Sequence, residues 1–291
     1  MEIKPKYRGI FFILLAAFCF ACMNVCVRLA GDVPTIQKSF FRNIVAFAIA
    51  AYVIIKNGNG FRPENLKNWP LFLARSLFGT FGILCNFYAV DHLLLSDASM
   101  LNKMSPFFAI LASFFLLKEK IHWHQLLVII GAFMGMLCVV KPSFQNVDLL
   151  PAIIGVCGGF CAGTAYTFVR KLGQVGEKGP LIVLIFSGFS CLVAVPFLIF
   201  DYHPMELVSW VSLIGAGLFA AGGQFSVTAA YCNAPAKEIS VYDYSQVIFS
   251  ALLGFFIFGD MPDGLSFVGY FIICAMAIVN FYMKLKEKQN N

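Results

Sequence analysis

Charged and aromatic side chains interrupt apolar stretches of this 291-residue sequence at positions where they could do chemistry. Asp243 lies between Tyr242 and Tyr244, and Gln246 follows one helical turn after Tyr242. Lys103, which lies in an earlier apolar stretch, is the strongest candidate among the basic residues. A carboxylate can bind an ammonium group when ionised and carry a proton when neutral, and tyrosine supplies stacking and hydrogen-bonding surface. We therefore interpret Asp243 as a group for charge recognition or proton coupling.

The remaining predicted substrate-binding residues are polar side chains in other apolar stretches. They are Asn24, Asn86, Tyr88, Asn102, Tyr166 and Gln224. Polar groups buried without partners are expensive, so such residues are functional candidates. Asn24 and Tyr166 are predicted to line one cavity from equivalent helices, because they align in the internal repeat described below.

The sequence predicts no catalytic residues, no metal site and no cofactor. His122 and His124 are two residues apart and would diverge on a helix, and no phosphate-binding loop occurs. Cys19, Cys22 and Cys26 share one helical face. A metal or redox site there stays open as an alternative, but we interpret these cysteines as small packing residues.

The elements that carry these residues are predicted to be membrane spans. The chain is 60% hydrophobic and 12% charged, with a mean hydropathy of +0.81, whereas soluble domains carry roughly 25% charged residues. Ten stretches approach or exceed the length that crosses a bilayer. They cover 9–30, 35–55, 69–90, 97–117, 124–140, 149–169, 180–200, 207–232, 239–258 and 265–283. We expect an all-α integral membrane protein.

Basic residues are distributed unequally between the two sides of the predicted membrane. Fifteen of the 21 Lys and Arg residues fall on one side, two on the other and four within spans. The side with more positive charge is normally cytoplasmic. Both termini are therefore predicted to face the cytoplasm, in a plasma (inner) membrane. The first span has no cleavage site after it and should be retained. The net charge of +6 is not a nucleic-acid signal.

The two halves of the chain share motifs in the same order. Phe18-Cys19 and Val27-Arg28 recur 142 residues later, and span four recurs in span nine 141 residues later. Five spans per half is an odd number, so the second half enters the membrane from the opposite side. We predict two inverted five-helix repeats, residues 1–143 and 144–291, with a site near the membrane midplane.

Depth within the spans separates the polar residues into two predicted layers. Counting 1.5 Å per residue puts Lys103 and Asp243 about 14 Å apart along the membrane normal, so we expect no direct ion pair between them. Arg42 and Arg75 lie nearer the starts of their spans, and we interpret them as structural residues that extend towards the membrane surface. Pro106 is predicted to kink the fourth span.

The repeated motifs resemble those of a known family. Phe87-Tyr88-Ala89-Val90, Ser96-Asp97-Ala98 and Ser105-Pro106 in the first half, and Ala234-Pro235-Ala236 with Gly259-Asp260 in the second, are similar to the drug/metabolite transporter (DMT) superfamily, EamA-like family. The resemblance implies ten helices in two inverted repeats around a central cavity, with the fifth helix of each repeat peripheral. Two positions depart from the family pattern: Lys118 replaces a usual Gly, and Asp260 a usual Glu.

Three functions remain open from the sequence. The first is a secondary transporter of small polar metabolites, which the resemblance favours as an exporter of amino acids or related compounds; S-adenosylmethionine, nucleosides, vitamins and drugs are alternatives. The second is a membrane enzyme acting on lipid, and the third is a lipid flippase or a non-transporting membrane component. The expected partners are the small solute and the lipid bilayer. A monomer or weak homodimer is expected. Gly131 and Gly135 are interpreted as helix-packing residues, with a dimer contact as the alternative.

Overall fold

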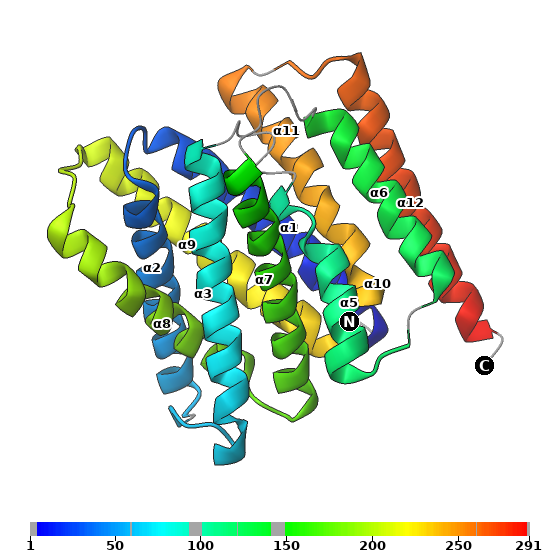
Figure 1. Cartoon of the computed structure of the whole chain (residues 1–291), viewed down its shortest axis with the longest axis horizontal. Helices are drawn as coiled ribbons and strands as arrows, with labels where there is room; N and C mark the ends of the chain where they lie inside the picture. Colours follow the sequence, from blue (N-terminus) through cyan, green and yellow to red (C-terminus); the bar gives the residue numbers. More distant parts are fainter. Residues whose placement is uncertain are drawn as a thin grey trace.

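The computed structural model describes residues 5–58, 60–92, 101–120, 122–140, 149–259 and 261–289. These residues form a helical bundle without strands (Figure 1). Three sequence features fall outside the described residues: positions 97–100 of the fourth predicted span, the Ser96–Ala98 motif and Asp260.

Helices occupy all ten predicted spans, and seven of those described are long and apolar enough to cross a membrane. The elements are α1 (Pro5–Leu29), α2 (Thr35–Lys56), η1 (Leu66–Asn68), α3 (Trp69–His92), α5 (Ser105–Leu117), α6 (Trp123–Val140), α7 (Leu149–Gln174), α8 (Gly179–Phe200), α9 (Leu207–Asn233), α10 (Ala236–Ile239), η2 (Ser240–Tyr244), α11 (Ser245–Phe258) and α12 (Gly264–Gln289). The backbone N–H and C=O groups of an α-helix hydrogen-bond to one another, and lipid offers them no other partner. The prediction of an all-α membrane fold is confirmed.

The fourth and ninth predicted spans are not continuous α-helices. Lys103 and Met104 form a turn, and α5 begins directly after it with Pro106 in its first turn. Proline fits there because the first helical residues have no intrahelical partner for their N–H groups. The prediction of a kink at Pro106 was therefore wrong. In the second half, the short α10 and the 3₁₀ helix η2 precede α11.

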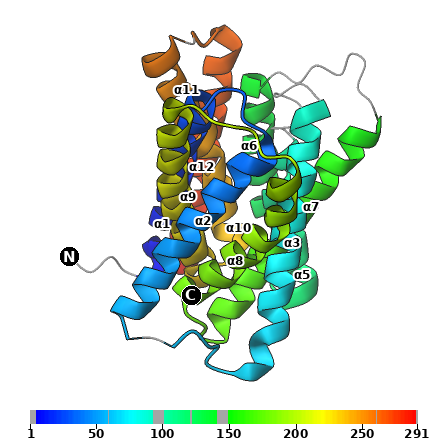
Figure 2. The ribbon, with the colours of Figure 1, turned by 90° about the vertical axis from the view of Figure 1, so that its left-hand side faces the viewer.

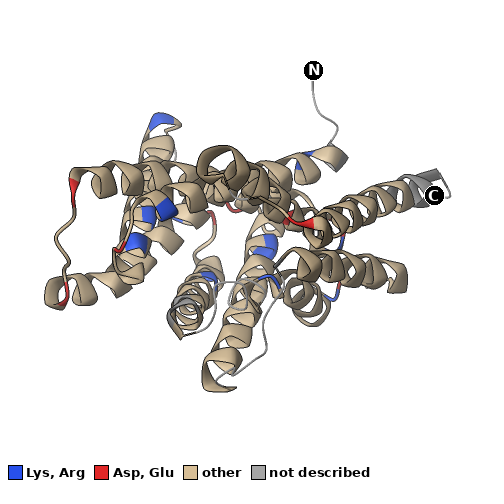
Figure 3. Ribbon diagram, turned by 90° about the horizontal axis from the view of Figure 1, so that it is seen from above, with Lys and Arg blue, Asp and Glu red and all other residues tan. Residues whose placement is uncertain are grey.

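The outer surface of the bundle is apolar, as a bilayer requires. Phe115 is 74% exposed and its repeat partner Phe256 is 77% exposed. Leu111 and Leu252, also related by the repeat, are 46% and 51% exposed. Charged residues are sparse along the helices (Figure 3). Repeat-related positions therefore share an environment as well as a residue type.

The most extensive contacts between helices follow the symmetry of the repeat: each of them recurs when both helices are replaced by their equivalents in the other half. In the first pair of contacts, α1 packs on α9 and α3 packs on α7. In the second, α5 packs on α7 and α11 packs on α1. The contacts α2–α8 and α6–α12 each join two equivalent helices, one from each half. Figure 2 shows α2 crossing α8 on the near side. This is the packing expected of two inverted repeats, with α6 and α12 together at one edge (Figure 1). The boundaries 1–143 and 144–291 stay a prediction.

Small residues allow these helices to approach closely. At the α3–α7 crossing, a Cβ added at Gly82 would lie 3.3 Å from the Gly158 carbonyl oxygen, and one at Gly158 would lie 3.3 Å from the Gly82 carbonyl oxygen. Gly131 and Gly135 face Met276 and Ile272 of α12. The interpretation of these two glycines as helix-packing residues is confirmed, because both pack against α12 within the chain.

A left-handed residue ends α5 and α11 at equivalent places. Lys118 has φ 55° and Gly259 has φ 71°. Glycine adopts this conformation without steric cost, whereas it is uncommon for other residues. The departure from the family pattern at Lys118 thus keeps the same backbone geometry with a less suited residue.

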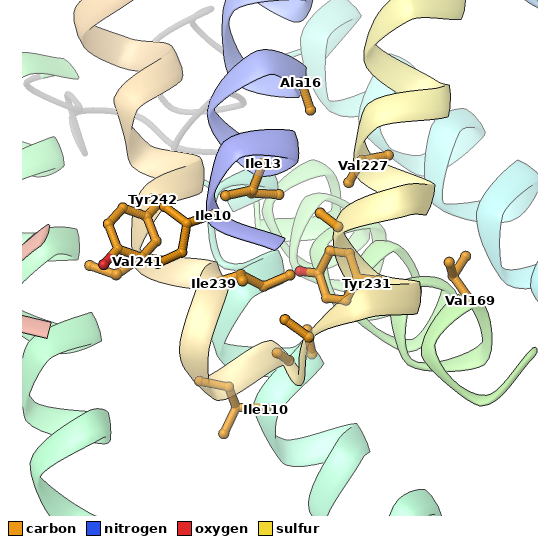
Figure 4. Close-up of a cluster of buried hydrophobic side chains, with 14 of the residues drawn as sticks. Ile10, Ile13, Ala16, Ile110, Val169, Val227, Tyr231, Ile239, Val241 and Tyr242 are labelled. Carbon is orange, nitrogen blue, oxygen red and sulfur yellow. The ribbon is translucent and has the colours of Figure 1, made fainter. Parts of the chain in front are cut away.

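The apolar core joins α1, α9 and the α10–η2 segment. Ile13, Tyr231 and Ile239 are each at most 2% exposed, and Figure 4 shows them converging from these three elements. At the predicted cytoplasmic end, Glu177 accepts hydrogen bonds from the backbone N–H of Glu64 (3.1 Å) and from Asn68 Nδ2 (2.6 Å). This contact ties the α2–α3 loop to the α7–α8 turn, so the half-repeats are held together at their ends as well as along the helices.

Chain direction alternates from helix to helix, and orientation in the membrane can be tested by labelling. Asn57 follows the end of α2, whereas Asp201 follows α8 and precedes His203, whose backbone is hydrogen-bonded to Gln37 near the start of α2. Both positions are exposed. In intact cells, a cysteine at 201 should react with a membrane-impermeant maleimide and one at 57 should not, with the parent chain as background for native cysteines. Labelling of position 57 from outside would reverse the predicted orientation.

Candidate functional site

The breaks in the fourth and ninth spans meet, and their charged residues form an ion pair. Lys103 Nζ lies 3.0 Å from Asp243 Oδ2 and donates to Gln246 Oε1 at 2.7 Å. The side chains of Lys103 and Asp243 are only 15% and 17% exposed. Lys103 Nζ also donates to the Asp243 carbonyl oxygen at 3.5 Å, so this partly buried lysine has three oxygen partners and joins the two halves of the protein.

This pairing corrects the depth prediction, which separated Lys103 from Asp243. The counting assumed straight α-helices, whereas Lys103 lies in a turn and Asp243 lies in a 3₁₀ helix. The flexible four-carbon stem of lysine also carries its ammonium group away from the backbone. The two polar layers therefore meet at this point.

Tyrosines support the ion pair from the same 3₁₀ helix. The Tyr244 hydroxyl donates to the Lys103 carbonyl at 3.1 Å, and Tyr244 is fully buried. This bond satisfies a carbonyl that the turn removes from helical pairing. Tyr242 is 6% exposed, and its hydroxyl has no hydrogen-bond partner among the described residues. Tyr244 therefore positions the pair, while Tyr242 offers an unused hydroxyl.

A second aromatic unit lies between helices α7 and α9. The rings of Tyr166 and Tyr231 stack with centroids 4.9 Å apart and planes at 12°. Tyr166 is within electrostatic reach of Asp243 and also of Arg42 and Arg75. Tyr166 therefore lies within electrostatic reach of charged residues from both halves of the protein.

The other predicted residues are more dispersed. Gln224 is 6% exposed with an unpartnered Nε2, and Asn86 and Asn102 are partly buried. Tyr88 stacks on His92 with centroids 4.1 Å apart, in the last turn of α3. Asn24 is exposed on α1. The structure thus gathers Lys103, Asp243, Tyr244 and Gln246 tightly and does not bring Asn24 or Tyr88 to that cluster.

Arg75 is a buried residue that the sequence interpretation placed wrongly. It is 3% exposed, and its guanidinium carbon lies 3.9 Å from the centroid of the Phe186 ring. The side chain therefore faces the protein interior and does not extend to the membrane surface. The sequence carried one signal, because Arg75 is an ionisable residue within a predicted span and such residues are functional candidates. Tyr231 carried none beyond being a tyrosine within a span.

A cavity of about 250 Å³ lies away from these residues, at the predicted cytoplasmic end. Arg62, Glu64, Glu177 and Lys178 contribute to its lining. Its acidic groups are already engaged: Glu177 by the α2–α3 loop, and Glu64 by Lys178 at 2.9 Å. We regard this cavity as a junction between loops. Within the described ranges, no three His, Cys, Asp or Glu residues are grouped to hold a metal ion.

The Lys103–Asp243–Gln246 cluster can bind a charged solute and exchange one of its own contacts for a contact with the solute. Lys103, Asp243 and Gln246 offer a cation, an anion and an amide within one cluster, so a zwitterionic or polar solute could replace any of the three contacts. The pair also joins the two halves, so its opening would change how they contact each other. Discontinuous helices at such a junction are typical of secondary transporters.

Comparisons with known proteins agree with this architecture. The chain matches the EamA-like transporter family twice, over residues 7–141 and 149–282. A solved crystal structure superimposes with a TM-score of 0.82, covering 94% of this chain and 96% of that chain, at 15% sequence identity. At that identity the likeness establishes the fold alone.

Named relatives are also transporters. The pseudopaline exporter CntI of Pseudomonas aeruginosa (strain UCBPP-PA14) is 30% identical over 276 residues, which cover 93% of this chain and 94% of the relative. A riboflavin transporter of Vibrio cholerae is 25% identical over 94% of this chain and 93% of its own length. Solute carrier family 35 member G1 of Homo sapiens is 23% identical over 87% of this chain and 73% of its own length. The prediction that this chain is not an enzyme is thereby confirmed, and the protein is a multi-pass membrane transporter of the EamA-like family within the drug/metabolite transporter superfamily.

Proposed function

We propose that this protein exports amino acids or related small polar metabolites by alternating access. The observation that carries the proposal is the Lys103–Asp243 ion pair, formed where two repeat-related spans are broken. A solute with an ammonium group can compete with Lys103 for Asp243, and one with an acceptor can compete with Asp243 for Lys103. Binding would thereby open the contact between the two halves and favour a second arrangement of the bundle.

The relatives support export and small polar solutes without fixing the substrate. A pseudopaline exporter is among the relatives at 30% identity, which favours the outward direction. Riboflavin transporters at 24–25% identity support a vitamin as the alternative substrate. S-adenosylmethionine, nucleosides and drugs complete the alternatives, and proton coupling through Asp243 is part of the proposal. The proposed location is the plasma membrane.

Reconstitution into proteoliposomes tests the proposed function. Vesicles loaded with unlabelled solute are diluted into a radiolabelled panel of amino acids, S-adenosylmethionine, nucleosides and riboflavin, and counterflow is recorded with and without a pH gradient. We expect saturable exchange of at least one amino acid, absent from protein-free vesicles. Exchange of riboflavin alone would replace the amino-acid proposal by the vitamin alternative. No exchange of any solute by folded protein would contradict the proposal as a whole.

A further inference from the structure

Two arginines of the first half have no counterion among the residues that the structure describes. Arg75 on α3 is 3% exposed, and its Nε–H has no hydrogen-bond partner. Neither Arg75 nor Arg42 of α2 makes an ion pair or a hydrogen bond to any residue that the structure describes. Arginine stays charged in proteins, so burying one without an anion is costly. Such a residue is normally retained because it binds something.

The neighbourhood of Arg75 is built to hold a guanidinium group. The guanidinium carbon lies over the Phe186 ring, 3.9 Å from the ring centroid. A Cβ at Gly79, one turn along α3, would overlap Arg75 Nη1 and come within 2.7 Å of the Phe186 ring. Glycine at 79 therefore leaves the space that the guanidinium occupies.

Among the described residues, the ionisable partners of Arg75 are neutral or positively charged. The ionisable groups that act electrostatically on Arg75 are Tyr166 and Arg42. Arg42 in turn responds to Tyr166. Two cations within reach of each other repel, and this repulsion is relieved when an anion lies between them.

Hydroxyl groups add further donors on the same two helices as Arg75 and Phe186. Ser76 on α3 and Ser187 on α8 are at most 1% exposed, and neither hydroxyl has a hydrogen-bond partner among the described residues. Thr80 and Ser190 bond to each other across the same interface at 2.7 Å. Guanidinium groups and hydroxyls are donors that suit an oxyanion, and the arginine fork matches the oxygens of carboxylate or phosphate.

We propose that Arg42 and Arg75 form an oxyanion subsite that binds the carboxylate or phosphate group of the transported solute. The inference rests on the proposed function and names its substrate class as anionic or zwitterionic. Tyr166 is within electrostatic reach of both arginines and of Asp243. A solute bound by its oxyanion at the arginines is therefore within electrostatic reach of Tyr166.

Ligand-dependent thermal unfolding of the purified full-length protein in detergent tests this subsite. The probes are succinate, its neutral diamide and glycerol 3-phosphate, at constant ionic strength set with sodium chloride. We expect succinate or glycerol 3-phosphate to raise Tm with saturation, and the diamide to leave Tm unchanged. Whichever of the two compounds raises Tm identifies the bound group of the solute as a carboxylate or a phosphate. If neither raises Tm, the subsite is disproved.

Arginine variants connect the binding to the two residues. Arg75→Gln and Arg42→Gln should each raise the half-saturating concentration at least tenfold. Arg75→Lys keeps the positive charge without the forked guanidinium group and should have a smaller effect. It replaces Arg75→Gln in the test if that variant does not fold. Arg28→Gln is the matched control, since Arg28 also stacks on a phenylalanine, Phe258, but at the end of α1. Equal half-saturation in Arg75→Gln and the parent protein would overturn the proposal. Failure of the solute panel in vesicles would instead remove the proposed transport function and leave this binding result standing.

Discussion

Asp243→Asn is expected to lower solute exchange in proteoliposomes at least tenfold and to abolish its response to a pH gradient. The change keeps the shape of the side chain and removes the charge that holds Lys103 Nζ at 3.0 Å. Gln246 would remain as a neutral partner at 2.7 Å, so the lysine keeps a hydrogen bond but loses its counterion. A solute ammonium group would then find no carboxylate, and a proton would find no group to bind.

Loss of folding must be separated from loss of transport. Removing one member of a buried ion pair destabilises proteins by about 3–5 kcal/mol, whereas replacing both members by neutral residues is often tolerated. Lys103→Met combined with Asp243→Asn should therefore recover the Tm of the parent protein while exchange stays low. Recovery of exchange in the double variant would show that the pair is structural, and the proposed site would be wrong.

An exposed ion pair provides the matched control for this prediction. Glu64 and Lys178 form a pair at 2.9 Å, but their side chains are 56% and 48% exposed. Exposed pairs contribute about 0–1 kcal/mol, because water solvates both charges. Glu64→Gln makes the same chemical change as Asp243→Asn and should leave exchange and Tm near the parent values. A similar loss in both variants would indicate a general effect of removing negative charge.

Gly163→Ala is expected to cause the largest loss of stability among single substitutions at the helix crossings. A Cβ at 163 would lie 2.6 Å from the Ala109 backbone nitrogen, 2.6 Å from the Ser105 carbonyl oxygen and 2.8 Å from Phe108 Cβ. Two of these three contacts are backbone atoms of α5, which cannot turn aside as a side chain can. Because α5 starts two residues after Lys103, pushing it away from α7 would also move the ion pair. Overpacking of this kind costs about 1–3 kcal/mol, and occasionally more.

Thermal unfolding in detergent, with exchange measured in parallel, checks this prediction. We expect the Tm of Gly163→Ala to fall by roughly 5 °C or more, given the usual relation between free energy of unfolding and Tm. Gly264→Ala is the control, because a Cβ there meets nothing within 4 Å. Gly155→Ala should be intermediate, since its nearest obstacle, at 2.6 Å, is the movable Leu101 Cδ1 atom. Equal Tm values for the 163 and 264 variants would show that α5 shifts at no cost.

The sequence alone determined the class of the protein and the broad arrangement of its helices. A bilayer forces each span to be apolar over its whole length, so hydropathy identifies spans without knowledge of their neighbours. The repeat was visible because equivalent positions, such as Phe115 and Phe256, face the same lipid environment and keep the same residue. Family membership followed from motifs distributed over most of the chain and was confirmed by two matches to one family.

The tertiary structure decided how the predicted site residues meet. Lys103 and Asp243 are 140 positions apart and come from different halves, so their contact depends on how the halves pack. Sequence counting misplaced them because a window of about 19 residues averages over a turn or a single 3₁₀ segment inside a span. For the same reason the counting treated Pro106 as a kink within a continuous helix, although α5 begins beside it.

Arg75 marks the limit of sequence interpretation. An arginine near the start of a span can extend to the membrane surface or turn into the bundle, and both conformations are consistent with the same sequence. The choice was made by residues distant in the chain: Phe186 on α8 offers a ring for the guanidinium group, and Gly79 leaves room for it. Hydropathy depends on one residue at a time and fixes which segments enter the membrane, whereas side-chain direction depends on several helices at once and is fixed only when they pack.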